Sequence, residues 1–86
     1  MEIKPNWTYQ SDIQIPYENA LAICKRWSKR LQAKTGKRVF YSVRPYELNV
    51  WHAGIDTKTH NKAVNSLARS INRMMGFAPV LPLRLR

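Results

Sequence analysis

The chain has 86 residues, the size of one small domain, and 44% of them are hydrophobic, which excludes a disordered protein. Fifteen Lys and Arg against five Asp and Glu give a net charge of +10 and indicate negatively charged partners. The single cysteine, Cys24, excludes an internal disulfide and a zinc site built on several cysteines, and no apolar run is long enough to cross a bilayer. Without an apolar N-terminal signal segment, we expect a cytoplasmic protein with no membrane role.

The first predicted elements are a strand and a helix. Between Trp7 and Ile15 the apolar side chains lie at odd-numbered positions and most of the polar ones at even-numbered positions, which predicts a half-buried strand. From Tyr17 to about Lys34 they recur at helical spacing, with Pro16 suited to the first helical position and Gly36 to the stop. The apolar stripe of this helix is Ala20, Cys24, Trp27 and Leu31, widened by Leu21 and Ile23.

The middle of the chain predicts a β-hairpin. Residues Val39–Val43 are β-branched or aromatic, and Leu48–Ala53 form a second short apolar segment. The turn between them contains Pro45, and Gly54 ends the second strand.

A second helix is predicted over Lys58–Met75, capped by Asp56 or Thr57 and ended by Gly76. Its apolar face consists of Val64, Leu67, Ala68, Ile71, Met74 and Met75. The order strand, helix, strand, strand, helix, with a right-handed crossover, places both helices on one face of a three-stranded sheet. The prediction is a two-layer α+β sandwich over residues 1–76, followed by an extended tail over residues 77–86.

Cations are concentrated where acids are missing. No acid occurs between Asn19 and Tyr46 or between Thr57 and Arg86. In the first helix two pairs of cations lie one turn apart, and three cations share the polar side of the second. We interpret this as a phosphate-binding surface, the alternative being an ordinary solvated helix face. The predicted contacts are Lys25, Arg26, Lys29, Arg30, Arg38, Arg44, Lys62, Arg69 and Arg73.

The other face of the sheet carries a second candidate feature. If Val39 and Leu48 face the helices, then Phe40 and Trp51 face away, with Arg38 and Arg44 beside them. Such a face is typical of platforms on which unpaired bases stack. The alternatives are that the two rings pack on each other or under the tail, or form a protein interface.

Nothing in the sequence indicates catalysis. His52 and His60 have no cysteine or paired carboxylate at ligand or triad spacing, and Cys24 lies in an apolar stripe. The three glycines form no phosphate-binding loop. We therefore expect no enzyme activity, no small-molecule substrate, no cofactor and no metal.

The predicted element order, at this length, resembles that of the DinI-like damage-inducible proteins, small regulators of the RecA filament. The likeness is best over Leu48–Met75, where Leu48, Asn49 and Val50 precede a glycine, and Thr57 with Lys58 opens a long final helix. The resemblance implies the same small α+β fold. Members of that family are acidic on the final helix, whereas this helix contains no acid, so their RecA-directed mechanism is not carried over.

The sequence leads to a non-enzymatic protein that contacts DNA, RNA or a nucleoprotein through basic helix faces, positioned by phosphates without reading base sequence. The alternative is a phage- or mobile-element-type regulator or inhibitor whose basic surface docks on an acidic patch of a host nucleic-acid-processing protein. A basic subunit of a larger ribonucleoprotein is a third possibility. In the regulator hypothesis the tail anchors the partner through Val80, Leu81, Leu83, Arg84, Leu85 and Arg86.

Overall fold

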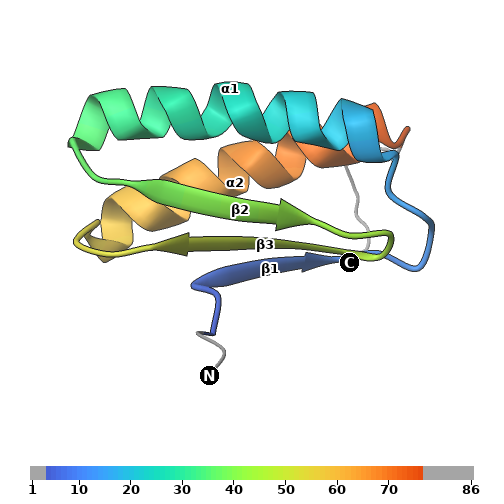
Figure 1. The fold of residues 1–86 in the computed structure, drawn as a ribbon, viewed down its shortest axis with the longest axis horizontal. Coiled ribbons are helices and arrows are strands. Elements are labelled where there is room, and N and C mark those ends of the chain that lie inside the picture. The colour runs from blue at the N-terminus through green and yellow to red at the C-terminus, as the bar shows by residue number, and fades with distance from the viewer. Residues whose placement is uncertain (1–3, 77–86) are drawn as a thin grey trace.

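The computed structural model describes residues 4–76, in which two helices cover one face of a three-stranded antiparallel sheet (Figure 1). This arrangement confirms the predicted α+β fold and its element order. The predicted tail, with its partner-binding residues, lies outside the described residues. The elements are β1 (Trp7–Gln10), α1 (Tyr17–Thr35), β2 (Val39–Val43), β3 (Glu47–His52) and α2 (Thr57–Met74).

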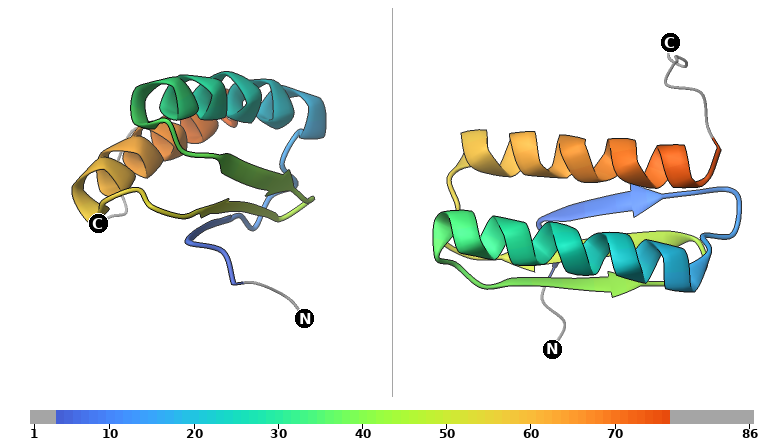
Figure 2. Two further views of the ribbon diagram at one scale, coloured as in Figure 1. Left: turned by 60° about the vertical axis from the view of Figure 1, so that its left-hand side comes forward. Right: turned by 90° about the horizontal axis from the view of Figure 1, so that it is seen from above.

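The third strand is the centre of the sheet. The strand order is β1-β3-β2, so β3 pairs antiparallel with both neighbours. Val50 of β3 lies opposite Trp7 on one side and Tyr41 on the other. Seen from above, α1 and α2 lie side by side over the sheet and run in opposite directions (Figure 2, right). The end of α1 therefore comes close to the start of α2.

The first strand is shorter than predicted. It ends at Gln10 because Ser11 forms a turn in which its hydroxyl accepts from the amide of Ile13 at 3.0 Å and donates to the carbonyl of Ile13 at 2.6 Å. The predicted alternation as far as Ile15 is therefore wrong. Ile13 is 54% exposed, whereas Ile15 is buried from a loop, with its amide bonded to the carbonyl of Pro45 at 2.7 Å.

The C-terminal end of α1 and the N-terminal end of α2 each have a capping residue. Gly36 closes α1 in the left-handed region, with φ at 72°, and its amide donates to the Gln32 carbonyl at 2.8 Å. Asp56 is the N-cap of α2, and its carboxylate accepts from the Thr59 amide at 3.1 Å. Hydrogen bonds from the side chain and then from the amide of Thr59 hold the pKa of Asp56 below its usual value. Pro16 is the N-cap of α1 and not its first residue, and β3 begins and ends one residue earlier than predicted.

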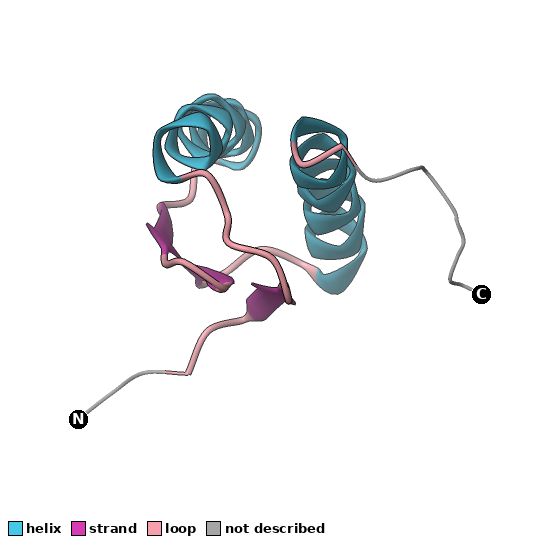
Figure 3. Cartoon of the chain, turned by 90° about the vertical axis from the view of Figure 1, so that its right-hand side faces the viewer, coloured by secondary structure: helices cyan, strands magenta, loops and turns pink. Residues whose placement is uncertain are grey.

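The core lies between the helical layer and the sheet (Figure 3). The predicted stripe residues Cys24, Leu67 and Ile71 are fully buried, while Ala68, Met74 and Met75 are only half-buried. The core cluster consists of Ile15, Ala20, Cys24, Leu31, Val39, Leu48, Val50, Leu67 and Ile71. Because these side chains use the inner sides of both helices, the outer sides are left to polar and charged residues.

The thiol of Cys24 has no exposed surface, and burial raises its pKa to about 11. We expect the native protein to resist a thiol reagent such as dithionitrobenzoate at pH 8, because the reactive thiolate is scarce and shielded. The rate of thiol labelling is measured at a series of urea concentrations, and it should increase as the fraction of unfolded protein increases. Since Cys24 is the only cysteine of the chain, the fully unfolded protein is the internal control. Native-state labelling at the unfolded rate would contradict the expectation.

Candidate nucleic-acid interface

The helical layer concentrates the positive charge of the protein. Nine of the 15 Lys and Arg residues of the chain lie in α1 and α2, against one acid, Glu18, in the first turn of α1. All nine are exposed. They are Lys25, Arg26, Lys29, Arg30, Lys34, Lys58, Lys62, Arg69 and Arg73.

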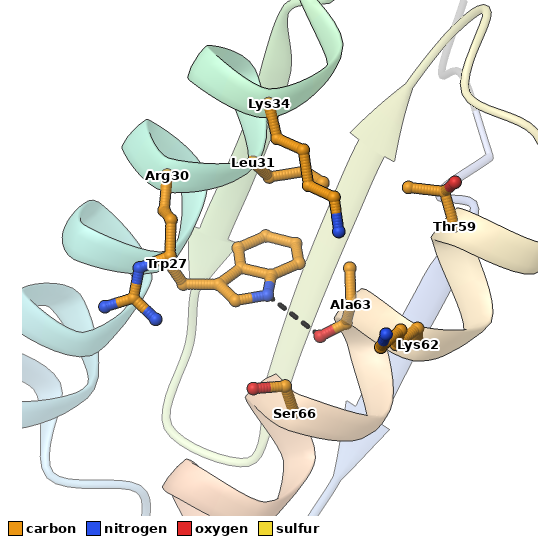
Figure 4. Close-up of a pocket in the computed structure, with 8 residues that line it drawn as sticks. All are labelled: Trp27, Arg30, Leu31, Lys34, Thr59, Lys62, Ala63 and Ser66. Atoms are coloured by element: carbon orange, nitrogen blue, oxygen red, sulfur yellow. Dashed lines mark hydrogen bonds between the residues drawn. The ribbon is translucent and has the colours of Figure 1, made fainter.

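A groove of about 190 Å³ separates the outer parts of the two helices (Figure 4). Each helix contributes four residues spaced at i, i+3, i+4 and i+7, so each wall is one continuous helix face. The floor and walls contain three apolar side chains, three cations, two hydroxyls and no acid. The lining residues are Trp27, Arg30, Leu31, Lys34, Thr59, Lys62, Ala63 and Ser66.

Trp27 connects the two walls. Its indole Nε1–H donates to the carbonyl oxygen of Ala63 at 2.9 Å, which joins α1 to α2 across the groove (Figure 4). The sequence places Trp27 in the apolar stripe of the first helix but does not indicate that it reaches the second helix. The large ring and its hydrogen bond together set how closely the two helices approach at this point.

The groove brings together cations that are distant in sequence. Lys34 extends from α1 toward α2, so its ammonium lies over the groove, and Lys62 stands on the opposite wall (Figure 4). The guanidinium of Arg30 is turned away from α2. Arg30 and Lys62 were predicted as phosphate contacts, whereas Lys34 was assigned only to the helix end. Its position four residues after Arg30, one turn along the same face, is the signal that could have identified it.

The other predicted helix contacts divide into two groups. At about 100° per residue, Lys25 lies roughly 200° around α1 from Trp27, so Lys25 and Lys29 occupy the flank turned away from α2. Arg69 and Arg73 follow Lys62 by about two and three turns and share its side of α2. The outer surface of the helical layer therefore carries the three groove cations together with Arg26, Arg69 and Arg73.

The predicted stacking residues lie on the opposite side of the sheet. Phe40 and Trp51 are directly opposite each other in the register of β2 and β3, and Phe40 is 54% exposed. The guanidinium carbon of Arg38 lies 5.5 Å from the centroid of the Phe40 ring, so this cation covers one face of the ring. Arg44, after β2, is exposed. One straight segment of nucleic acid cannot contact this face and the helices together.

A carboxylate lies on the face of the sheet that is turned away from the helices. Asn49, only 5% exposed, accepts a hydrogen bond from the Thr8 hydroxyl and donates to a carboxylate oxygen of Glu47, both at 2.7 Å. Glu47 therefore places negative charge on the same face of the sheet as the predicted stacking residues. Because a carboxylate repels phosphates, the helical layer is the stronger candidate interface.

The two histidines contact each other, which the sequence analysis did not foresee. Nε2 of His52, at the end of β3, lies 2.7 Å from Nδ1 of His60 in α2. Burial, with a smaller effect from His60, lowers the pKa of His52. Within residues 4–76 no three His, Cys, Asp or Glu side chains are grouped so that they could hold a metal ion. The described helices include none that is long and apolar enough to span a membrane.

We predict that Trp27→Phe lowers the free energy of unfolding by about 1 kcal/mol, because it removes the hydrogen bond to Ala63 while keeping an aromatic ring. Urea unfolding followed by circular dichroism measures the change. The matched control is Trp7→Phe, since the Trp7 indole packs against the core without a hydrogen bond to another described residue. Equal losses in the two variants would contradict a structural role for the indole N–H.

The pKa of His52 also predicts a pH dependence of stability. Below a pH of about 6.5, the ordinary pKa of histidine, His52 binds a proton in the unfolded chain before it does so in the folded one. The free energy of unfolding should therefore fall as the pH decreases from 7.5 toward 5. The melting temperature, measured by thermal unfolding across this pH range, should depend less on pH for His52→Gln than for the wild-type protein. An unchanged slope in that variant would show that another group causes the dependence.

Comparison with protein families, curated proteins and solved structures finds no match to this chain. Its function therefore has to be inferred from its own surface. Two features of the helical layer are available for this, the excess of cations and the groove between α1 and α2.

Proposed function

We propose that this protein binds nucleic acid through the outer surface of its helical layer, without reading the base sequence. The observation that carries the proposal is the concentration of nine exposed cations on two adjacent helices that contain a single acid. Three of the proposed contacts, Arg30, Lys34 and Lys62, line the groove, and Arg26, Arg69 and Arg73 lie on the outer sides of the same helices.

Phosphate groups are the partners that this charge pattern favours. Surface cations are usually interleaved with acids, which relieve their mutual repulsion. Here one acid faces nine cations, so ions from the solvent have to screen most of the repulsion. A bound polyanion takes the place of these ions, and counterions are released from the phosphates of the polyanion. Binding should therefore be strong at low salt and weaken steeply as salt is added.

The packing of the helices supports contact without sequence readout. Both helices lie with their inner sides against the sheet or against each other, and neither projects from the surface (Figure 2). Readout of bases in the major groove by a helix needs such a projecting element. Contacts from Lys and Arg to phosphates position a protein on a strand but carry no direct sequence information.

Fluorescence anisotropy with labelled single-stranded DNA, duplex DNA and RNA tests the proposal. Between about 50 and 200 mM salt, six phosphate contacts to duplex DNA predict a slope of roughly −5 in a plot of log K against log salt. Affinity should be the same for unrelated base sequences. Absence of binding to all three polymers at low salt, or a marked preference for one sequence, would contradict the proposal.

A pair of double variants locates the surface. Arg69→Gln with Arg73→Gln should weaken binding and reduce the magnitude of the slope by about 2, since each removes one phosphate contact. Arg38→Gln with Arg44→Gln removes the same charge from the sheet face and is the matched control, with a smaller expected change. A larger loss in the control would assign binding to the sheet face.

A further inference from the structure

We propose that the groove between α1 and α2 is a preformed seat for one sugar–phosphate unit of the bound strand. Lys34 and Lys62 would hold the phosphate from opposite walls, and the apolar floor would receive the sugar. This inference rests on the proposed nucleic-acid binding and adds a discrete site within the basic surface.

The lining of the groove matches the two parts of such a unit. Trp27, Leu31 and Ala63 provide an apolar floor, which suits the carbon atoms of a sugar ring. The walls add the ammonium groups of Lys34 and Lys62 and the hydroxyl of Ser66, which suit a phosphate. The groove, at about 190 Å³, is smaller than the sites of about 300–1,000 Å³ that hold drug-sized ligands, in keeping with a single small unit.

The polar groups are arranged around an empty centre. The ammonium of Lys34 lies over the groove, and Lys62 faces it from α2 (Figure 4). Ser66, on the same wall as Lys62, has a hydroxyl that makes no hydrogen bond to another described residue, whereas the Thr59 side chain is hydrogen-bonded to the carboxylate of Asp56. No acid lines the groove, and the carboxylate of Asp56, which is hydrogen-bonded to Thr59, lies at the end of the wall where α2 begins. Arg30 lies one turn before Lys34 and can reach the next phosphate along the strand.

The seat is formed before the ligand arrives. The hydrogen bond from Trp27 to the Ala63 carbonyl fixes the floor, and the buried Leu31 anchors the wall on α1. The wall on α2 starts from the capped turn at Asp56. Because the floor and the helix backbones are already ordered, only exposed side chains such as those of Lys34 and Lys62 have to be ordered on binding.

The first test compares two double variants that remove equal charge from the same protein. Lys34→Gln with Lys62→Gln removes the proposed clamp, and anisotropy should show a loss of affinity of about tenfold or more for single-stranded or duplex DNA. Lys25→Gln with Lys29→Gln, on the flank of α1 away from α2, should cause a clearly smaller loss. Equal losses, with the wild-type protein still binding, would overturn the seat and leave the proposed function in place.

The second test changes no charge. Ser66→Ala should weaken binding by about twofold to tenfold, with an unchanged salt slope, because a hydroxyl donor is lost and the ionic contacts are kept. Unchanged affinity would remove the Ser66 hydroxyl from the seat. Circular dichroism melts establish that each variant is folded before its affinity is compared.

The third test observes the groove directly. In a Trp7→Phe and Trp51→Phe background, Trp27 is the only tryptophan and its emission reports on the groove floor. A short oligothymidylate should change this emission at the concentrations at which anisotropy detects binding. Binding without any change of emission would overturn the seat, whereas no binding by either measurement would overturn the proposed function itself.

Discussion

The indole of Trp27 is the contact on which the functional surface depends. It is the large side chain between two neighbouring helices, and its N–H is bonded to the Ala63 carbonyl at 2.9 Å. Packed helices normally approach to about 8–10 Å, at a distance set by the side chains at their contact. A large ring at this point keeps the outer edges of α1 and α2 apart, so a groove remains where smaller residues would have closed the seam. The cations on both walls then face a common space.

The excess charge and the fold are compatible because they use different sides of the same helices. The inner sides supply buried residues such as Cys24, Leu67 and Ile71, and the outer sides supply exposed Lys and Arg. Mutual repulsion among the cations opposes the compact state. A polyanion that binds only the folded protein relieves this repulsion and also stabilises the fold by mass action. The surface that we propose for binding is thus the part of the fold that a bound polyanion would stabilise most.

The helices, the hairpin and their order were predictable because helical and strand periodicities are local properties of the chain. The end of β1 was not predictable, because the alternation of apolar residues in the sequence continues to Ile15. In the structure a turn at Ser11 ends the strand at Gln10. Arg30 and Lys62 were recognised separately, but their position across one groove depends on the antiparallel packing of α1 and α2. Thr59 and Ser66 carry no signal in the sequence, and the contact between the two histidines depends on how β3 leads into α2.

The position of β1 at the edge of the sheet has a consequence for the order of folding. Its register pairs Trp7 with Val50 and Gln10 with Glu47, so its partner comes only after α1 and β2. The hairpin of β2 and β3 closes a short loop, whereas docking β1 closes a long one at a higher entropic cost. A template strand must also exist before an edge strand can add to it. We therefore expect β1 to dock on the sheet last, although it precedes β2 and β3 in the chain.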